Sequence, residues 1–122
     1  MERICIVDDD EAVRDSLAVF LEACGYAVVG FASALAFLTA ADAANFLCLL
    51  VDMHMPGMTG IELIEILRSR GDGTPAILIT AAADPLLRAQ GEKLSGFAFL
   101  DKPVDGDKLL DTIAATSELN KT

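Results

Sequence analysis

The stretch FLCLLVDMHMPGMTGIELIEIL, residues 46–67, joins two patterns through a turn. Its first six residues, 46–51, form a continuous apolar run, which is typical of a strand buried on both faces of a sheet. Asp52 ends the run, and a Pro-Gly turn follows it. Apolar residues then recur at helical spacing, namely Ile61, Ile64 and Leu67. A buried strand followed by an amphipathic helix is the repeating unit of a parallel α/β sheet.

The same alternation extends in both directions from this stretch. Short apolar runs predict strands over 3–7, 26–31, 46–51, 76–79 and 97–100. Helices are predicted between them, with Asp10 and Ser33 as the N-caps of the first two. Asp84-Pro85 predicts the start of a fourth helix, whose apolar face is interrupted at residues 90–92. The last helix carries Leu109, Leu110 and Ile113.

Five strands alternating with five helices predict an α/β fold with a single doubly wound, five-stranded parallel sheet. The common strand order for such a sheet is 2-1-3-4-5, with the ligand site outside the carboxyl ends of strands 1 and 3. The length of 122 residues suits one domain over 1–122, with a polar tail at 119–122.

Composition and charge exclude several classes of function. Hydrophobic residues make up 53% of the chain, which is enough for a real core. The net charge of −10 repels phosphate backbones and anionic lipid, so we expect no direct contact with nucleic acid or membrane. The three cysteines, Cys5, Cys24 and Cys48, form no metal or redox motif. We expect all three to be buried, in a protein of the reducing cytoplasm.

Polar residues follow four of the predicted strands. Asp8 and Asp9 follow the first, Asp52 the third, Thr80 the fourth and Lys102 the fifth. Because the carboxyl ends of parallel strands lie on one edge, we expect these side chains to meet there. Three close carboxylates repel one another by several kcal/mol, about 4 per pair at 4 Å and an effective dielectric constant of 20. Hard oxygen ligands of this kind favour Mg²⁺, and a Lys and a hydroxyl nearby suit a phosphoryl group.

The sequence resembles the response-regulator receiver domains of bacterial two-component signalling. The resemblance lies in IVDDDE at 6–11, LLVDMHMPGMTGIEL at 49–63, ILIT at 77–80 and FLDKP at 99–103, and it covers residues 3–116. It implies the flavodoxin-like receiver fold, and a signalling switch rather than an enzyme. It also implies that Asp52 accepts a phosphoryl group from a histidine kinase or a phosphotransfer protein.

The resemblance further assigns the other site residues. It implies that Asp9 binds Mg²⁺ directly, that Asp8 acts largely through water, and that Asp52 and the backbone carbonyl of His54 complete the protein ligands. Acids at positions 10 and 11 are expected to cap the following helix.

Four residues are implied to respond to the phosphoryl group or to shape the loop beside it. Thr80 would donate a hydrogen bond to a phosphoryl oxygen, and Lys102 would pair with its charge. Phe99 occupies the aromatic switch position, whose ring turns inward as Thr80 moves. The Lys102–Pro103 peptide bond is a candidate for the cis form.

Output and oligomeric state are open at this stage. The fourth helix, the fifth strand and the fifth helix form the usual output face, which implies a downstream protein target or an effector domain. The chain is expected to be a monomer or a phosphorylation-dependent dimer. It could act alone or be the receiver portion of a longer transcription regulator or hybrid kinase.

An Mg²⁺-dependent aspartyl-phosphate phosphatase and a flavin carrier are distant alternatives. The phosphatase would need an acid at position 54, and acids in the first loop would repel a flavin phosphate.

Overall fold

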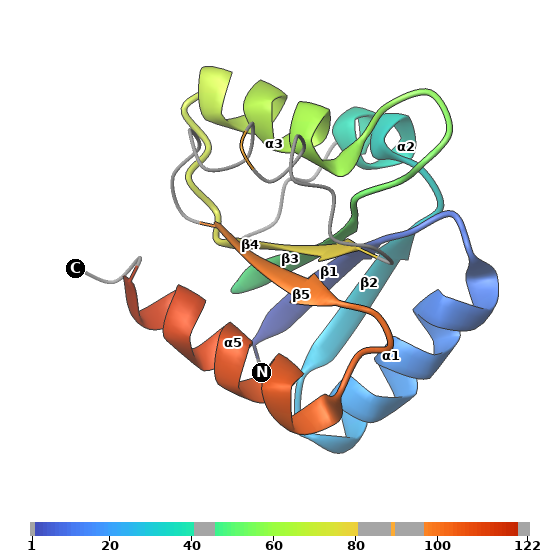
Figure 1. The fold of residues 1–122 in the computed structure, drawn as a ribbon, viewed down its shortest axis with the longest axis vertical. Coiled ribbons are helices and arrows are strands. Elements are labelled where there is room, and N and C mark those ends of the chain that lie inside the picture. The colour runs from blue at the N-terminus through green and yellow to red at the C-terminus, as the bar shows by residue number, and fades with distance from the viewer. Residues whose placement is uncertain (1, 41–45, 81–88, 90–96, 120–122) are drawn as a thin grey trace.

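The computed structural model describes residues 2–40, 46–80, 89 and 97–119 (Figure 1). Strands and helices alternate from β1 to β4 and from β5 to α5, as the sequence predicts. Their bounds are β1 Arg3–Val7, α1 Glu11–Ala23, β2 Ala27–Phe31, α2 Ala34–Thr39, β3 Cys48–Asp52, α3 Gly60–Ser69, β4 Ala76–Thr80, β5 Phe97–Asp101 and α5 Gly106–Leu119.

All four strand pairings are parallel, and the strand order is β2-β1-β3-β4-β5. The predicted fold class and strand order are therefore confirmed. The fourth predicted helix, which was expected from Asp84, lies outside the described residues. The described part of α5 includes Leu119, the first residue of the predicted polar tail.

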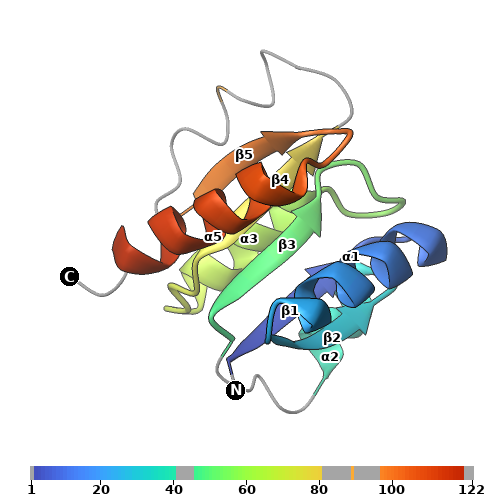
Figure 2. The same cartoon turned by 90° about the horizontal axis from the view of Figure 1, so that it is seen from below.

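Helices cover both faces of the sheet. Figures 1 and 2 show α2 and α3 on one face and α1 and α5 on the other. Side chains alternate along each strand, so every central strand supplies both layers. On β1, for example, Cys5 and Val7 pack in the core beneath α2 and α3, whereas Ile4 and Ile6 pack in the core beneath α1 and α5.

The helix caps agree with the sequence, but some strand bounds do not. Asp10 accepts from the amides of Ala12 and Val13 at the start of α1, and Ser33 caps α2. β2 begins one residue later than predicted, β3 begins two residues later, and β3, β4 and β5 each end one residue later. Just before β3, the Leu47 amide donates to the carbonyl of Arg3 on β1, so backbone hydrogen bonding to β1 begins one residue ahead of the strand.

The expectation that all cysteines are buried is wrong for one of them. Cys5 and Cys48 are fully buried, but Cys24 is exposed. Cys24 follows the apolar spacing of α1, but the helix ends at Ala23. Gly25 then takes a φ of +96°, which turns the chain toward β2 and leaves the Cys24 side chain in solvent.

In the part of the chain that the structure describes, none of the helices is long and apolar enough to cross a membrane.

Candidate functional site

The first two acids stand where β1 ends. The Asp8 amide donates to the Phe31 carbonyl at 3.1 Å, which continues the hydrogen bonding between β1 and β2. Asp8 is 2% exposed, and its Oδ1 accepts from the Asp10 amide at 2.9 Å. Asp9 is exposed. The turn into α1 therefore fixes the carboxylate of Asp8 and leaves that of Asp9 open to solvent.

Asp52 is the last residue of β3 and lies beside Asp8. Val7 and Val51 are register partners on β1 and β3, and both pack beneath α2 and α3. The next residues, Asp8 and Asp52, therefore point to the opposite face of the sheet, the face of α1 and α5. Asp52 is 6% exposed, and its Oδ1 accepts from the His54 amide at 3.1 Å.

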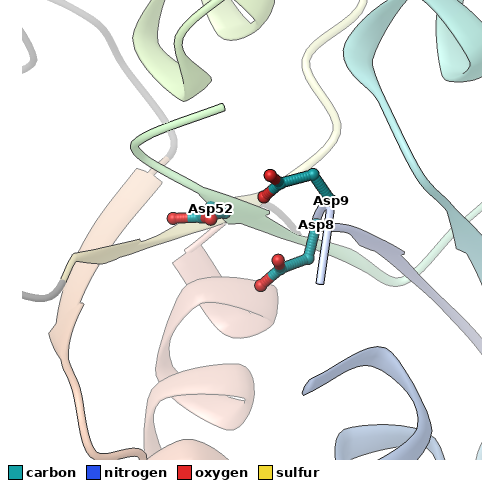
Figure 3. A group of neighbouring side chains, drawn as sticks. All are labelled: Asp8, Asp9 and Asp52. Carbon is teal, nitrogen blue, oxygen red and sulfur yellow. The ribbon is translucent and has the colours of Figure 1, made fainter. Parts of the chain in front are cut away.

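The three acids form one cluster (Figure 3). Carboxylate oxygens of Asp8, Asp9 and Asp52 lie within 4.8 Å of one another, and the side chains of Asp8 and Asp9 extend toward Asp52. Three carboxylates at this separation repel one another, so a bound cation would reduce the electrostatic repulsion between them. The donor set consists of hard oxygen atoms from two neighbouring strands, so these residues fit Mg²⁺ better than a softer metal.

The environment of Asp8 disfavours its charged form. Burial raises the pKa of Asp8 above its usual range, and the negative charges of Asp52 and Asp9 act in the same direction. The hydrogen bond from the Asp10 amide and the positive charge of Lys102 act to lower the same pKa. The charged form of Asp8 therefore destabilises the native fold, and a bound cation would offset this destabilisation.

A hydroxyl and an ammonium group complete this edge of the sheet. Thr80 ends β4 and is 2% exposed, and its carbonyl accepts from the Lys102 amide at 2.8 Å. The Lys102 Nζ lies 3.7 Å from Asp52 Oδ1, and the Lys102 side chain is 30% exposed. Lys102 thus has one carboxylate of the cluster as a partner and keeps access to solvent.

The remaining predicted residues lie around this centre. Phe99 lies on β5 opposite Leu78, is half-buried, and packs against the core beneath α2 and α3. The Lys102–Pro103 peptide bond is cis. The amide of His54 contacts Asp52, and the His54 side chain is exposed.

Two contributors to the site were absent from the sequence predictions. The guanidinium of Arg14 donates to the Asp8 carbonyl at 2.6 Å. No sequence motif predicts this contact. Thr59 and Glu62 form a capping box that starts α3 just beyond the loop after Asp52. The Thr-x-x-Glu spacing could have revealed this cap.

Comparison with known proteins decides the family. A family model described as the response regulator receiver domain matches residues 4–114. The chain belongs to this family. Members of the receiver family act in two-component signalling, and aspartate phosphorylation and Mg²⁺ are general features of the family.

Similar proteins support the same assignment. The receiver is 39% identical over 111 residues to the transcriptional regulatory protein FixJ of Azorhizobium caulinodans, a match that covers 91% of this chain and 53% of FixJ. It is 36% identical over 116 residues to the sensory/regulatory protein RpfC of Xanthomonas campestris, covering 92% of this chain and 16% of RpfC. A receiver-domain protein of Methanospirillum hungatei has a TM-score of 0.88 at 31% identity, covering 99% of this chain and 97% of that one. The receiver spans about half the length of FixJ and of several other curated relatives that it matches.

Proposed function

We propose that this receiver takes a phosphoryl group onto Asp52 and thereby switches a protein-binding face. The observation that carries the proposal is the cluster of three carboxylates within 4.8 Å, with Lys102 Nζ 3.7 Å from Asp52 Oδ1. A carboxylate that pairs with a lysine ammonium group and belongs to a candidate metal-binding cluster has the surroundings that phosphoryl transfer requires.

Asp52 is the proposed nucleophile. A carboxylate oxygen of Asp52 attacks the phosphorus of a phosphohistidine, the new O–P bond forms, and the N–P bond breaks. The electron pair of that bond returns to the imidazole nitrogen of the donor, so no further reactant is needed. Oδ1 already accepts from the His54 amide, which helps to fix the carboxylate in position for this attack.

Asp8, Asp9 and Asp52, with the backbone carbonyl of His54, are the proposed ligands of Mg²⁺. When bound, Mg²⁺ supplies positive charge that offsets the carboxylates and the phosphoryl oxygens. Asp9 is the more accessible ligand, whereas the buried Asp8 is held by the Asp10 amide. This difference supports direct binding through Asp9 and a largely water-mediated contact through Asp8.

Thr80 and Lys102 are proposed to bind the phosphoryl group after transfer. Lys102 exchanges its 3.7 Å contact with Asp52 for a phosphoryl oxygen, and the Thr80 hydroxyl donates a hydrogen bond. Thr80 is the register partner of Asp101 on β5, and Phe99 lies two residues earlier on that same strand. A shift of Thr80 toward the phosphoryl group therefore has a direct route to the half-buried ring of Phe99, the proposed switch residue.

The proposed partners follow from this chemistry. The phosphoryl donor is a histidine kinase or a phosphotransfer protein. The output is a downstream protein or an effector domain that recognises the face of the fourth helix, β5 and α5, of which the structure describes β5 and α5. A groove of about 350 Å³ lies beside the site between α1 and the loop after β5. It includes Lys102 and Pro103, so it is continuous with the site and suits contact with the donor.

The remaining functional statements are also proposals. We infer a cytoplasmic setting, because three free cysteines fit a reducing compartment. We infer that residues 1–122 act as one receiver unit, either as a monomer or as a phosphorylation-dependent dimer. The net charge of −10 supports protein rather than nucleic-acid contacts for the receiver itself.

A small phosphodonor tests the proposed function. We expect incubation with acetyl phosphate and Mg²⁺ to add one phosphoryl group, measured by intact mass, and expect EDTA to prevent the addition. Asp52→Asn removes the nucleophile and should abolish the addition. Asp15→Asn makes the same chemical change at an exposed position of α1 and should leave it intact. Equal phosphorylation of the Asp52→Asn protein and its parent would rule out the assignment.

A further inference from the structure

Arg14 of α1 contacts the backbone that carries the two acids. Its guanidinium donates to the Asp8 carbonyl at 2.6 Å, and its side chain is half-buried. The Asp8 carbonyl belongs to the peptide that joins Asp8 to Asp9. A hydrogen bond to that peptide restricts its rotation, and its orientation sets the carboxylate of Asp9 relative to that of Asp8.

The path of the Arg14 side chain crosses β2 at Gly30. A Cβ atom built on Gly30 would lie 3.5 Å from Arg14 Cδ and 4.0 Å from Arg14 Nε. Gly30 pairs with Ile6 on β1, two residues before Asp8. An alanine would therefore make an ordinary contact with the arginine stem, whereas a longer side chain would compete for the space that the stem occupies.

Arg14 completes a set of hydrogen bonds to Asp8 at the end of β1. The Asp8 amide is bound to Phe31 of β2, and the Asp8 carboxylate is bound to the Asp10 amide. Arg14 donates a further hydrogen bond to the Asp8 carbonyl. Amide, carboxylate and carbonyl of the same residue are thus each held from a different direction.

We propose that Arg14 is a positioning residue for the acidic site, holding the Asp8–Asp9 peptide across the space that Gly30 leaves on β2. The proposal rests on the proposed Mg²⁺ site and deepens it. Residues that orient metal ligands without binding the metal change its affinity by about 10- to 100-fold when they are replaced. We expect Arg14→Met, which keeps much of the apolar stem but removes the donor, to weaken Mg²⁺ binding by about tenfold.

The direction of the change in Mg²⁺ affinity distinguishes a positioning role of Arg14 from an effect of its charge alone. Arg14 carries a positive charge near a site for a cation, so its removal would strengthen Mg²⁺ binding if charge alone mattered. A positioning role predicts the opposite result. Arg70→Met makes the same change at an exposed residue that follows α3, away from the acids, and controls for the altered net charge.

Titration of the full chain with Mg²⁺, followed by calorimetry and by the amide NMR signals of Asp9 and Asp10, tests the proposal. We expect weaker binding for Arg14→Met, unchanged binding for Arg70→Met, and partial recovery for Arg14→Lys, which restores one donor. NMR spectra without Mg²⁺ verify that each variant is folded. Binding by Arg14→Met that equals or exceeds that of the parent would overturn the proposal.

Substitutions at Gly30 keep the test decisive if Arg14→Met does not fold. Gly30→Ala should leave Mg²⁺ affinity unchanged, and Gly30→Leu should reduce it by displacing the Arg14 stem. Equal affinity in the Gly30→Ala and Gly30→Leu proteins would also contradict the proposal. If the parent protein itself binds no Mg²⁺, it is the proposed function that fails, so the two failures are distinguishable.

Discussion

Replacing Asp8 with Asn should stabilise the protein when no divalent cation is present. Asp8 is 2% exposed and belongs to the cluster of three carboxylates. Asn has nearly the same shape, and its Oδ1 can still accept from the Asp10 amide. The substitution therefore removes a charge from the cluster with little change in packing.

The magnitude follows from the separations in the structure. Carboxylate oxygens of Asp8 and Asp52 lie at most 4.8 Å apart, which corresponds to a repulsion of about 3.5 kcal/mol at an effective dielectric constant of 20. The exposed Asp9 adds about 1 kcal/mol at the dielectric constant of water. Loss of the charge-assisted hydrogen bond from the Asp10 amide offsets about 2 kcal/mol of this total, and loss of the attraction to Lys102 acts in the same direction. We therefore expect a gain of about 2 kcal/mol in the free energy of unfolding.

Urea unfolding in EDTA measures this gain. The chain has no tryptophan, so far-ultraviolet circular dichroism is the suitable probe. With a slope of about 2 kcal/mol per molar urea, the Asp8→Asn midpoint should rise by about 1 M. Asp15→Asn on the exposed side of α1 is the matched control and should leave the midpoint unchanged within a few tenths of a molar.

Cation and pH dependence add two further expectations. Mg²⁺ at 100 times its dissociation constant would stabilise the parent protein by about 2.7 kcal/mol, and it should stabilise Asp8→Asn by much less. The pKa of Asp8 is raised in the native state, so its ionisation destabilises the fold as pH rises above the usual value of 3.8. The difference between the two proteins should therefore vanish in acid and grow toward neutral pH. A midpoint for Asp8→Asn at or below that of the parent in EDTA at pH 7 would refute the reasoning.

Three more predictions concern packing and cysteine chemistry. Gly60→Ala should destabilise the protein by about 1–3 kcal/mol in urea unfolding, because the added Cβ would lie 2.7 Å from both the last carbonyl of β3 and Leu78 Cδ2; an unchanged midpoint would contradict this. Burial raises the pKa of the Cys5 and Cys48 thiols to about 12, so at pH 8 a thiol reagent should label Cys24 alone until the protein is unfolded. Because the native thiols stay protonated while unfolded thiols ionise near pH 9, the free energy of unfolding should also fall between pH 9 and 12, by about 1.4 kcal/mol per pH unit for each thiol.

The fold and the outline of the site could be predicted because they depend on patterns that one sequence contains. Apolar runs such as 46–51 identify buried strands, and the helical spacing of Ile61, Ile64 and Leu67 identifies a covering helix. In a parallel sheet the residue that follows each strand reaches a common edge. This topological rule alone brought Asp8 and Asp52 into the same predicted site, which the cluster in the structure now supports.

The apolar pattern predicted the bounds of individual strands and helices less well than it predicted their order. Residues 46 and 47 continue the apolar run, but β3 begins at Cys48, and the Leu47 amide just before it donates to the carbonyl of Arg3 on β1. Cys24 has the spacing of a core residue, but it follows the last turn of α1 and is exposed. Hydrophobicity reports the tendency to be buried, and it does not report where a hydrogen-bonded element stops.

The sequence by itself determined the order of strands and helices and the residue types at the carboxyl edge, because periodicity and topology act over whole elements. Only the tertiary structure decided that Asp8 is buried while Asp9 is open, and that Arg14 reaches the Asp8 carbonyl over Gly30. These features depend on side-chain conformations and on separations of a few ångströms between α1, β1 and β2. Such distances are set by packing between elements, which no repeating pattern along the chain encodes.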